Sequence, residues 1–163
     1  MNFIIFMAFI LLLRMGELIL SGKNEKKLLQ QGAVQYGKEH YPFMIALHTL
    51  FFVSLVVEYV LKQPQTFSLI LLVFYFLLLA FKVWVLSSLG HFWSTKIYHI
   101  AGVPLIKKGP YKYIKHPNYL IVIVEILIIP LIFHLYITAI IFSVLNGCML
   151  FVRINEENKV LRI

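Results

Sequence analysis

The sequence predicts an all-α, polytopic integral membrane protein built as a bundle of about five transmembrane helices. Hydrophobic residues make up 61% of its 163 residues and charged residues 13%. In soluble domains, about half of the residues are apolar and about a quarter are charged. The apolar residues also stand in long runs, and about 20 of them in a helix cross the hydrocarbon of a bilayer. A chain of this length suits a single domain, residues 1–163.

The first half of the chain contains three runs long enough to cross a membrane, at residues 2–20, 41–61 and 67–87. The first run contains Arg14 and Glu17, which stand three residues apart and are expected to pair on one face of the helix. We expect Arg14, and Lys82 of the third run, to extend their charged ends toward the membrane surface.

A helical hairpin is expected to close the chain. Residues 119–152 stay apolar, which is too long for one straight crossing and just enough for two short ones. Pro130 and residues 134–136 mark the bend, because proline interrupts the hydrogen bonding of a helix. We therefore expect N-terminal spans within residues 1–66 and a C-terminal core within residues 67–163.

The lysines and arginines predict the orientation in the membrane. They gather in residues 21–40, in residues 88–118 and after residue 152, whereas the opposite side carries only Lys62. The positive-inside rule assigns the basic side to the cytosol, with the N-terminus outside. Because the net charge of +8 follows the membrane boundaries, we expect no nucleic-acid partner.

Polar residues gather where the fourth span is expected to begin. Residues 107–119, KKGPYKYIKHPNY, change from a lysine-rich loop to an apolar helix. Pro117 suits the first position of a helix, so this helix end, with its free N–H groups, should face the cytosol. The hairpin returns the tail, with Arg153, Glu156 and Glu157, to the same border. The two polar clusters therefore predict a binding site there.

Glu125 lies one or two turns inside the fourth span. A carboxylate in the membrane is costly, which makes Glu125 a candidate for a functional site, although a polar contact that joins two helices is the alternative. The same alternative applies to His48 and Glu58 of the second span. The chain has one cysteine, Cys148, and neither an HExxH motif nor repeated Cys/His spacing, so no metal site is expected.

Three stretches of the sequence resemble the isoprenylcysteine carboxyl methyltransferase family. Residues 109–119, GPYKYIKHPNY, resemble its GPYRYxRHPxY signature, and residues 153–161, RINEENKVL, resemble its closing RIxxEExxL. Residues 90–95, GHFWST, are similar to its GRFWT loop, with His91 in place of arginine. The first half is similar to a bacterial branch in which some members O-methylate alkylpyrones or phenolic lipids.

The resemblance implies S-adenosylmethionine as the methyl donor, bound by cytosolic loops of a protein in the bacterial cell membrane. An aromatic face would suit the donor's sulfonium, and a tail glutamate would suit its ammonium. The candidate cofactor-binding residues are Trp93, Leu105, Tyr113, His116, Asn118, Tyr119, Arg153, Glu156 and Glu157.

The implied reaction is methyl transfer to an oxygen of a lipophilic acceptor that enters from the membrane lipid. Glu125 is the candidate general base, with His116 and His48 as alternatives. Carboxyl methylation of a prenylcysteine-like substrate stays open. However, Ile121 and Glu125 stand where the prenylcysteine enzymes tend to have a glycine and an aromatic residue.

Two other classes of membrane protein are also considered. Sterol reductases that use NADPH have an analogous C-terminal scaffold, but they end in a PNYxGD-type motif, and this chain reads PNYLIV from residue 117. A small transporter could use Glu17, Glu58 and Glu125 as a proton path. Transporters commonly show repeated halves, and none is visible here.

Overall fold

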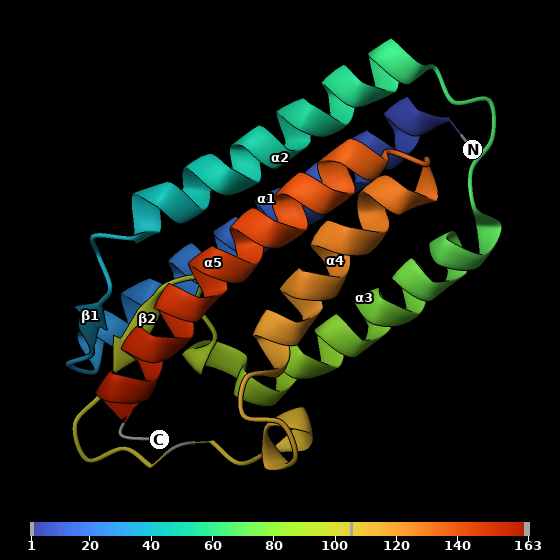
Figure 1. Ribbon diagram of the computed structural model, residues 1–163. Helices are drawn as coiled ribbons and strands as arrows, with labels where there is room; N and C mark the ends of the chain where they lie inside the picture. The colour runs from blue at the N-terminus through green and yellow to red at the C-terminus, as the bar shows by residue number, and fades with distance from the viewer. Residues whose placement is uncertain (1, 105, 162–163) are drawn as a thin grey trace.

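The computed structural model describes residues 2–104 and 106–161, and in these residues it is a bundle of five α-helices (Figure 1). This result confirms the all-α helical fold. The helices are α1 Phe3–Gln30, α2 Tyr41–Lys62, α3 Leu69–Leu89, α4 Pro117–Ile132 and α5 Tyr136–Leu161.

Four of these helices, α1, α2, α3 and α5, are long and apolar enough to cross a membrane. The remaining helix, α4, has 16 residues and is about 24 Å long at 1.5 Å per residue, less than the roughly 30 Å of bilayer hydrocarbon. The closing hairpin is therefore uneven, because α5 continues as a helix through the polar tail to Leu161. The sequence had instead suggested two short crossings.

The hairpin turns at residues 133–135, close to the expected bend. Pro130 lies in the last turn of α4, and its carbonyl accepts hydrogen bonds from the N–H groups of Phe133 and Leu135. His134 adopts a φ of 57°, which reverses the chain direction. At the same end of the bundle, the N–H of Ser68 donates to the carbonyl of Ile132, 2.8 Å away, and joins the start of α3 to α4.

The start of α5 is capped by a carboxylate from another helix. Glu58 of α2 accepts hydrogen bonds from the N–H groups of Ile137, at 3.1 Å, and Thr138, at 2.7 Å. These N–H groups lie in the first turn of α5, where no partner exists within the helix. Lys62 lies 2.8 Å from the same carboxylate. The buried Glu58 thus joins α2 to α5. This is the alternative of a polar contact between two helices that the sequence left open for Glu58.

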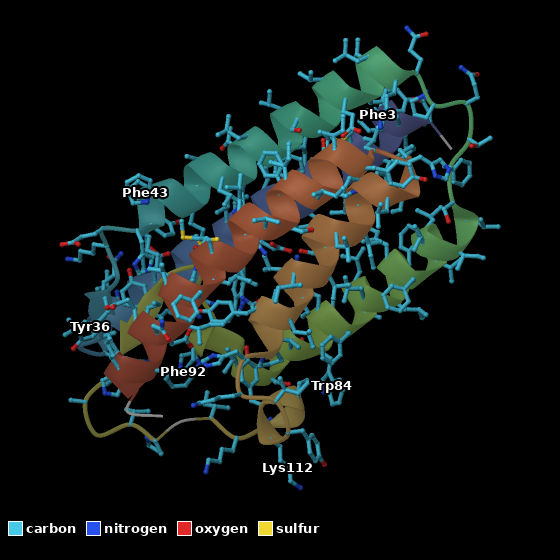
Figure 2. All side chains as sticks on the ribbon, viewed as in Figure 1. Phe3, Tyr36, Phe43, Trp84, Phe92 and Lys112 are labelled. Carbon is cyan, nitrogen blue, oxygen red and sulfur yellow. The ribbon has the colours of Figure 1, made fainter. Side chains whose placement is uncertain are left out.

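The core and the outer surface of the bundle are both apolar. Phe3 stacks on Tyr59 with ring centroids 3.7 Å apart, and Phe133 packs edge-on against Phe3. Phe43 and Trp84 project away from the bundle (Figure 2) and are more than half exposed. Large apolar side chains exposed over the helix surfaces are suited to lipid rather than to water.

A small antiparallel sheet joins the two long loops. Strand β1, Val34–Tyr36, pairs with β2, Ile97–His99, so that Gln35 lies opposite Tyr98. The sheet lies beside the C-terminal part of α5 (Figure 1). Segments that carry most of the lysines thus meet at one end of the bundle.

Replacing Glu58 with alanine is expected to lower the free energy of unfolding by about 1–2 kcal/mol, because the start of α5 loses its cap. Glu58→Gln keeps one acceptor and should cost less. Thermal unfolding of the detergent-solubilised protein measures both effects. Lys62→Ala is the control, since a partly exposed ion pair contributes little. An unchanged melting temperature for Glu58→Ala would contradict the capping role.

Candidate functional site

The start of α4 and the end of α5 meet through a cluster of polar side chains. The hydroxyl of Tyr119 donates to the carboxylate of Glu157 and accepts a hydrogen bond of 2.9 Å from Nε of Arg153. His116 stacks on Tyr119 at 5.4 Å between ring centroids, and its Nδ1 lies 3.8 Å from Glu157. We call His116, Tyr119, Arg153 and Glu157 the border cluster.

Arg153 ties the border cluster to the rest of the protein. Its guanidinium also donates to the backbone carbonyl of Thr95, in the loop after α3, and to the sulfur of Met44 in α2. The side chain is 7% exposed. A buried guanidinium needs several acceptors, and it finds them only where these elements converge.

The loop after α3 is held against α1. The side chain of Asn24 donates to the carbonyls of Gly90, at 3.1 Å, and Trp93, at 2.8 Å. Glu25 pairs with Lys96 at 2.7 Å, and this hydrogen-bonded carboxylate raises the pKa of Lys96. Trp93 is buried, and its Nε1 has no hydrogen-bond partner in the described part of the chain. A buried donor without a partner is costly, so the position of this indole N–H needs an explanation.

Three neighbouring cavities surround the border cluster. The loop cavity has a volume of about 380 Å³ and lies under the segment between β2 and α4. The border cavity, of about 110 Å³, lies at the border cluster itself. The helix cavity, of about 310 Å³, lies between α1, α2, α4 and α5 and has mostly apolar walls.

The border cavity shares wall residues with both the loop cavity and the helix cavity. Tyr111 and Glu157 line both the loop cavity and the border cavity. Tyr119 and Arg153 line both the border cavity and the helix cavity. The Tyr119–Arg153 pair therefore stands between a polar space reached from the loops and an apolar space between the helices.

A second polar cluster lies deeper in the bundle and contains Glu125, which is 2% exposed. Its carboxylate accepts from Arg14 at 2.8 Å and from Lys82 at 2.9 and 3.2 Å. Glu17 pairs with Arg14, also at 2.8 Å, and with Lys82. We call these four residues the ion cluster. It joins α1, α3 and α4, and its two cations balance its two carboxylates.

The ion cluster corrects one expectation from the sequence. The expected Arg14–Glu17 pair is present. However, Lys82 does not extend to the membrane surface, because it is 6% exposed and bonded to Glu125. Burial is tolerated because the ammonium meets two carboxylates inside the bundle.

The structure brings most of the candidate cofactor-binding residues together, since Trp93, Asn118 and the four members of the border cluster all line the border cavity. Glu156 points elsewhere and pairs with Lys159 at 2.8 Å. Tyr113 is 78% exposed and lies outside the cavity walls. Leu105 falls outside the described residues. Glu125 lies in the ion cluster, apart from His116.

Sequence reasoning missed several residues that line the cavities, among them Tyr98, Tyr111 and Asn146. Tyr111 stands inside the 109–119 motif and could have been included. Burial raises the pKa of Tyr111, so its hydroxyl stays protonated. Asn146 is a lone amide within an apolar run, and the cost of polar groups in a membrane could have marked it. No local signal marks Tyr98.

Comparisons with known proteins give a family and two uncharacterised relatives. The model of the isoprenylcysteine carboxyl methyltransferase (ICMT) family matches residues 68–163. The uncharacterized protein YpbQ of Bacillus subtilis is 43% identical over 162 residues, which cover 98% of this chain and 96% of YpbQ. An uncharacterized protein of Haemophilus influenzae is 32% identical over 127 residues, 74% of this chain and 72% of that protein. No solved structure matches the chain.

Replacing Lys82 with methionine should lower the free energy of unfolding by about 3–5 kcal/mol, because two buried carboxylates would then face one guanidinium. The double variant Lys82→Met/Glu125→Gln should recover part of this loss, since it removes one charge of each sign. Unfolding of the solubilised protein in denaturant measures Lys82→Met, Glu125→Gln and the double variant. A double variant whose loss equals the sum of the two single losses would contradict the pairing.

Proposed function

Because the chain belongs to the isoprenylcysteine carboxyl methyltransferase family, we propose that it uses S-adenosylmethionine to methylate an oxygen of a lipophilic acceptor. The acceptor would be of the alkylpyrone or phenolic-lipid type. The family supports a membrane methyltransferase. The observation that carries the finer proposal is the Tyr119–Arg153 wall, which separates a polar cavity from an apolar one.

The residues around the loop and border cavities fit S-adenosylmethionine. The loop cavity, of about 380 Å³, is within the range of roughly 300–1,000 Å³ found for small-molecule sites. Glu157 suits the ammonium group, and Lys107 and Lys115 suit the carboxylate. Aromatic rings of Tyr98 and Tyr111 suit the adenine and the positive charge on sulfur. When bound, S-adenosylmethionine supplies a methyl group activated by a sulfonium.

The protein's own contribution is alignment and the exclusion of water. Tyr119 is fixed by Arg153 and Glu157, so the wall between the two cavities has a defined position. Correct alignment of two reactants can be worth about 7–11 kcal/mol of the barrier. A donor from the water side and an acceptor from the lipid side would meet at this wall.

Glu125 and His116 are the candidate catalytic residues, and the geometry favours a different role for each of them. Both oxygens of Glu125 accept hydrogen bonds from cations, and Glu125 is absent from the described walls of the helix cavity. This arrangement favours a structural role, although a role as base stays a hypothesis. His116 lines the border cavity beside Glu157, which supports a role at the donor.

The distribution of basic residues supports a site that faces the cytoplasm, with the N-terminus outside. Four apolar helices fit integral membrane localisation. The sheet, the loop between β2 and α4, and the end of α5 lie at one end of the bundle (Figure 1). A water-soluble donor would enter there, and a membrane lipid would reach the helix cavity from the side.

Replacing Glu157 with glutamine should weaken the binding of S-adenosylmethionine about 10- to 100-fold, because a hydrogen bond to a charged group is lost. Glu156→Gln is the matched control and should leave the affinity unchanged, since Glu156 pairs with Lys159 at the surface. Isothermal titration of the solubilised protein measures both dissociation constants.

Incubation of membranes with labelled donor and extracted lipids, followed by mass spectrometry, tests the reaction itself. A lipid that gains the mass of one CH₂ is the expected product. Binding of NADPH in place of S-adenosylmethionine would favour a reductase, and methylation confined to prenylated thiol acids would favour the carboxyl methyltransferase alternative. Solute flux without donor binding would favour a transporter.

A further inference from the structure

The loop between β2 and α4 carries two lysines on its outer surface, away from the cavities. Lys107 and Lys115 line the loop cavity, whereas Lys108 and Lys112 are exposed and line none of the three cavities. Among the described residues, no carboxylate pairs with Lys108 or Lys112. Their positive charges are therefore available to an anion from outside the protein.

Gly109 places these lysines against the outer side of α3. Its φ is 57°, and a Cβ in its place would clash with the hydroxyl of Ser88 and lie 3.3 Å from Nε1 of Trp84. The close approach of the loop to α3 thus depends on glycine. Trp84 is 53% exposed, and its ring projects away from the bundle (Figure 2). The lysines therefore lie beside a tryptophan on the apolar outer surface of the helices.

Tyr113 adds a second exposed ring to the same surface. It was expected to bind the methyl donor, but it is 78% exposed and lies outside the cavity walls. Nζ of Lys112 lies 5.5 Å from the centroid of its ring. Tryptophan and tyrosine are enriched where membrane hydrocarbon meets the head groups, because each has an apolar ring and a polar tip. We call Trp84, Lys108, Lys112 and Tyr113 the interface patch.

We propose that the interface patch binds the head group of an anionic phospholipid, and that this contact raises the affinity of the loop cavity for the methyl donor. The two lysines favour an anionic lipid, because a zwitterionic head group already balances its own phosphate with a cation. The two rings favour a lipid over a soluble anion. Only the effect on the donor rests on the proposed methyltransferase function.

The effect on the donor follows from the order of residues in the loop. Lys108 and Lys112 directly follow Lys107 and Tyr111, which both line the loop cavity. A lipid that holds the outer lysines also holds the backbone of these two wall residues. Ordering a wall in advance lowers the cost of binding the donor. By linkage, the donor must raise the affinity for the lipid by the same factor.

Tryptophan fluorescence tests the lipid preference without any donor. The chain has two tryptophans, and Trp93 is 4% exposed, so Trp84 is the one that contacts lipid. Phosphatidylglycerol and phosphatidylcholine, each brominated in the acyl chains, are compared as quenchers with the wild-type protein. We expect phosphatidylglycerol to bind about tenfold more tightly, because each lysine near an anionic head group contributes roughly fivefold. Equal quenching by the two lipids would overturn the proposal.

Two double variants of equal charge test the position of the patch. Lys108→Gln/Lys112→Gln should lose most of the preference for phosphatidylglycerol. Lys26→Gln/Lys27→Gln is the matched control, since it removes two exposed lysines from α1, and it should keep the preference. The same loss in both double variants would show that overall charge attracts the lipid, and would overturn the patch. An unchanged melting temperature shows that each variant is folded.

Titration of S-adenosylmethionine in nanodiscs tests the link to the donor. We expect the wild-type protein to bind it at least about fivefold more tightly in phosphatidylglycerol than in phosphatidylcholine, and Lys108→Gln/Lys112→Gln to bind it equally in both. Equal wild-type affinities in the two lipids would refute the link. A wild-type protein that binds no S-adenosylmethionine in either lipid would refute the proposed function instead, while the quenching ratio would still decide whether the patch binds anionic lipid.

Discussion

The arrangement of the candidate site depends on the buried guanidinium of Arg153. A cation inside a membrane protein must find acceptors within the protein, because neither lipid nor bulk water can supply them. Arg153 finds them at Tyr119 of α4, at the carbonyl of Thr95 in the loop after α3, and at Met44 of α2. The same contacts hold the loop, the start of α4 and the end of α5 against one another.

A second constraint of the same kind holds the middle of the bundle. Glu125 and Lys82 are each too costly to bury alone, but together with Arg14 and Glu17 they form a neutral group. The group joins helices that are far apart in the sequence, since Arg14 and Glu125 are separated by 111 positions. Two buried polar clusters thus fix the helices, and apolar packing fills the space between them.

The border cluster divides the interior by polarity. On the loop side of Tyr119, the cavity walls carry lysines, tyrosines and Glu157. On the helix side they are mostly aliphatic and aromatic. A protein that joins a water-soluble molecule to a lipid needs such a boundary, because neither reactant dissolves where the other is stable. The boundary lies at the start of α4, at the same end of the bundle as the two long loops.

The sequence by itself determined the membrane class, the closing hairpin and the family, because hydropathy and short motifs are local properties of the chain. It also indicated that residues 116–119 and 153–157 meet, since a hairpin returns its end to its starting side. Only the tertiary structure distinguished the two tail glutamates. Glu157 bonds to Tyr119, whereas Glu156 pairs with Lys159 at the surface. The tertiary structure also decided that Lys82 is buried and that His48 and Asn146 share one cavity. These facts depend on which helices pack together. The spacing of residues along one helix does not determine which side chain of another helix each of them contacts.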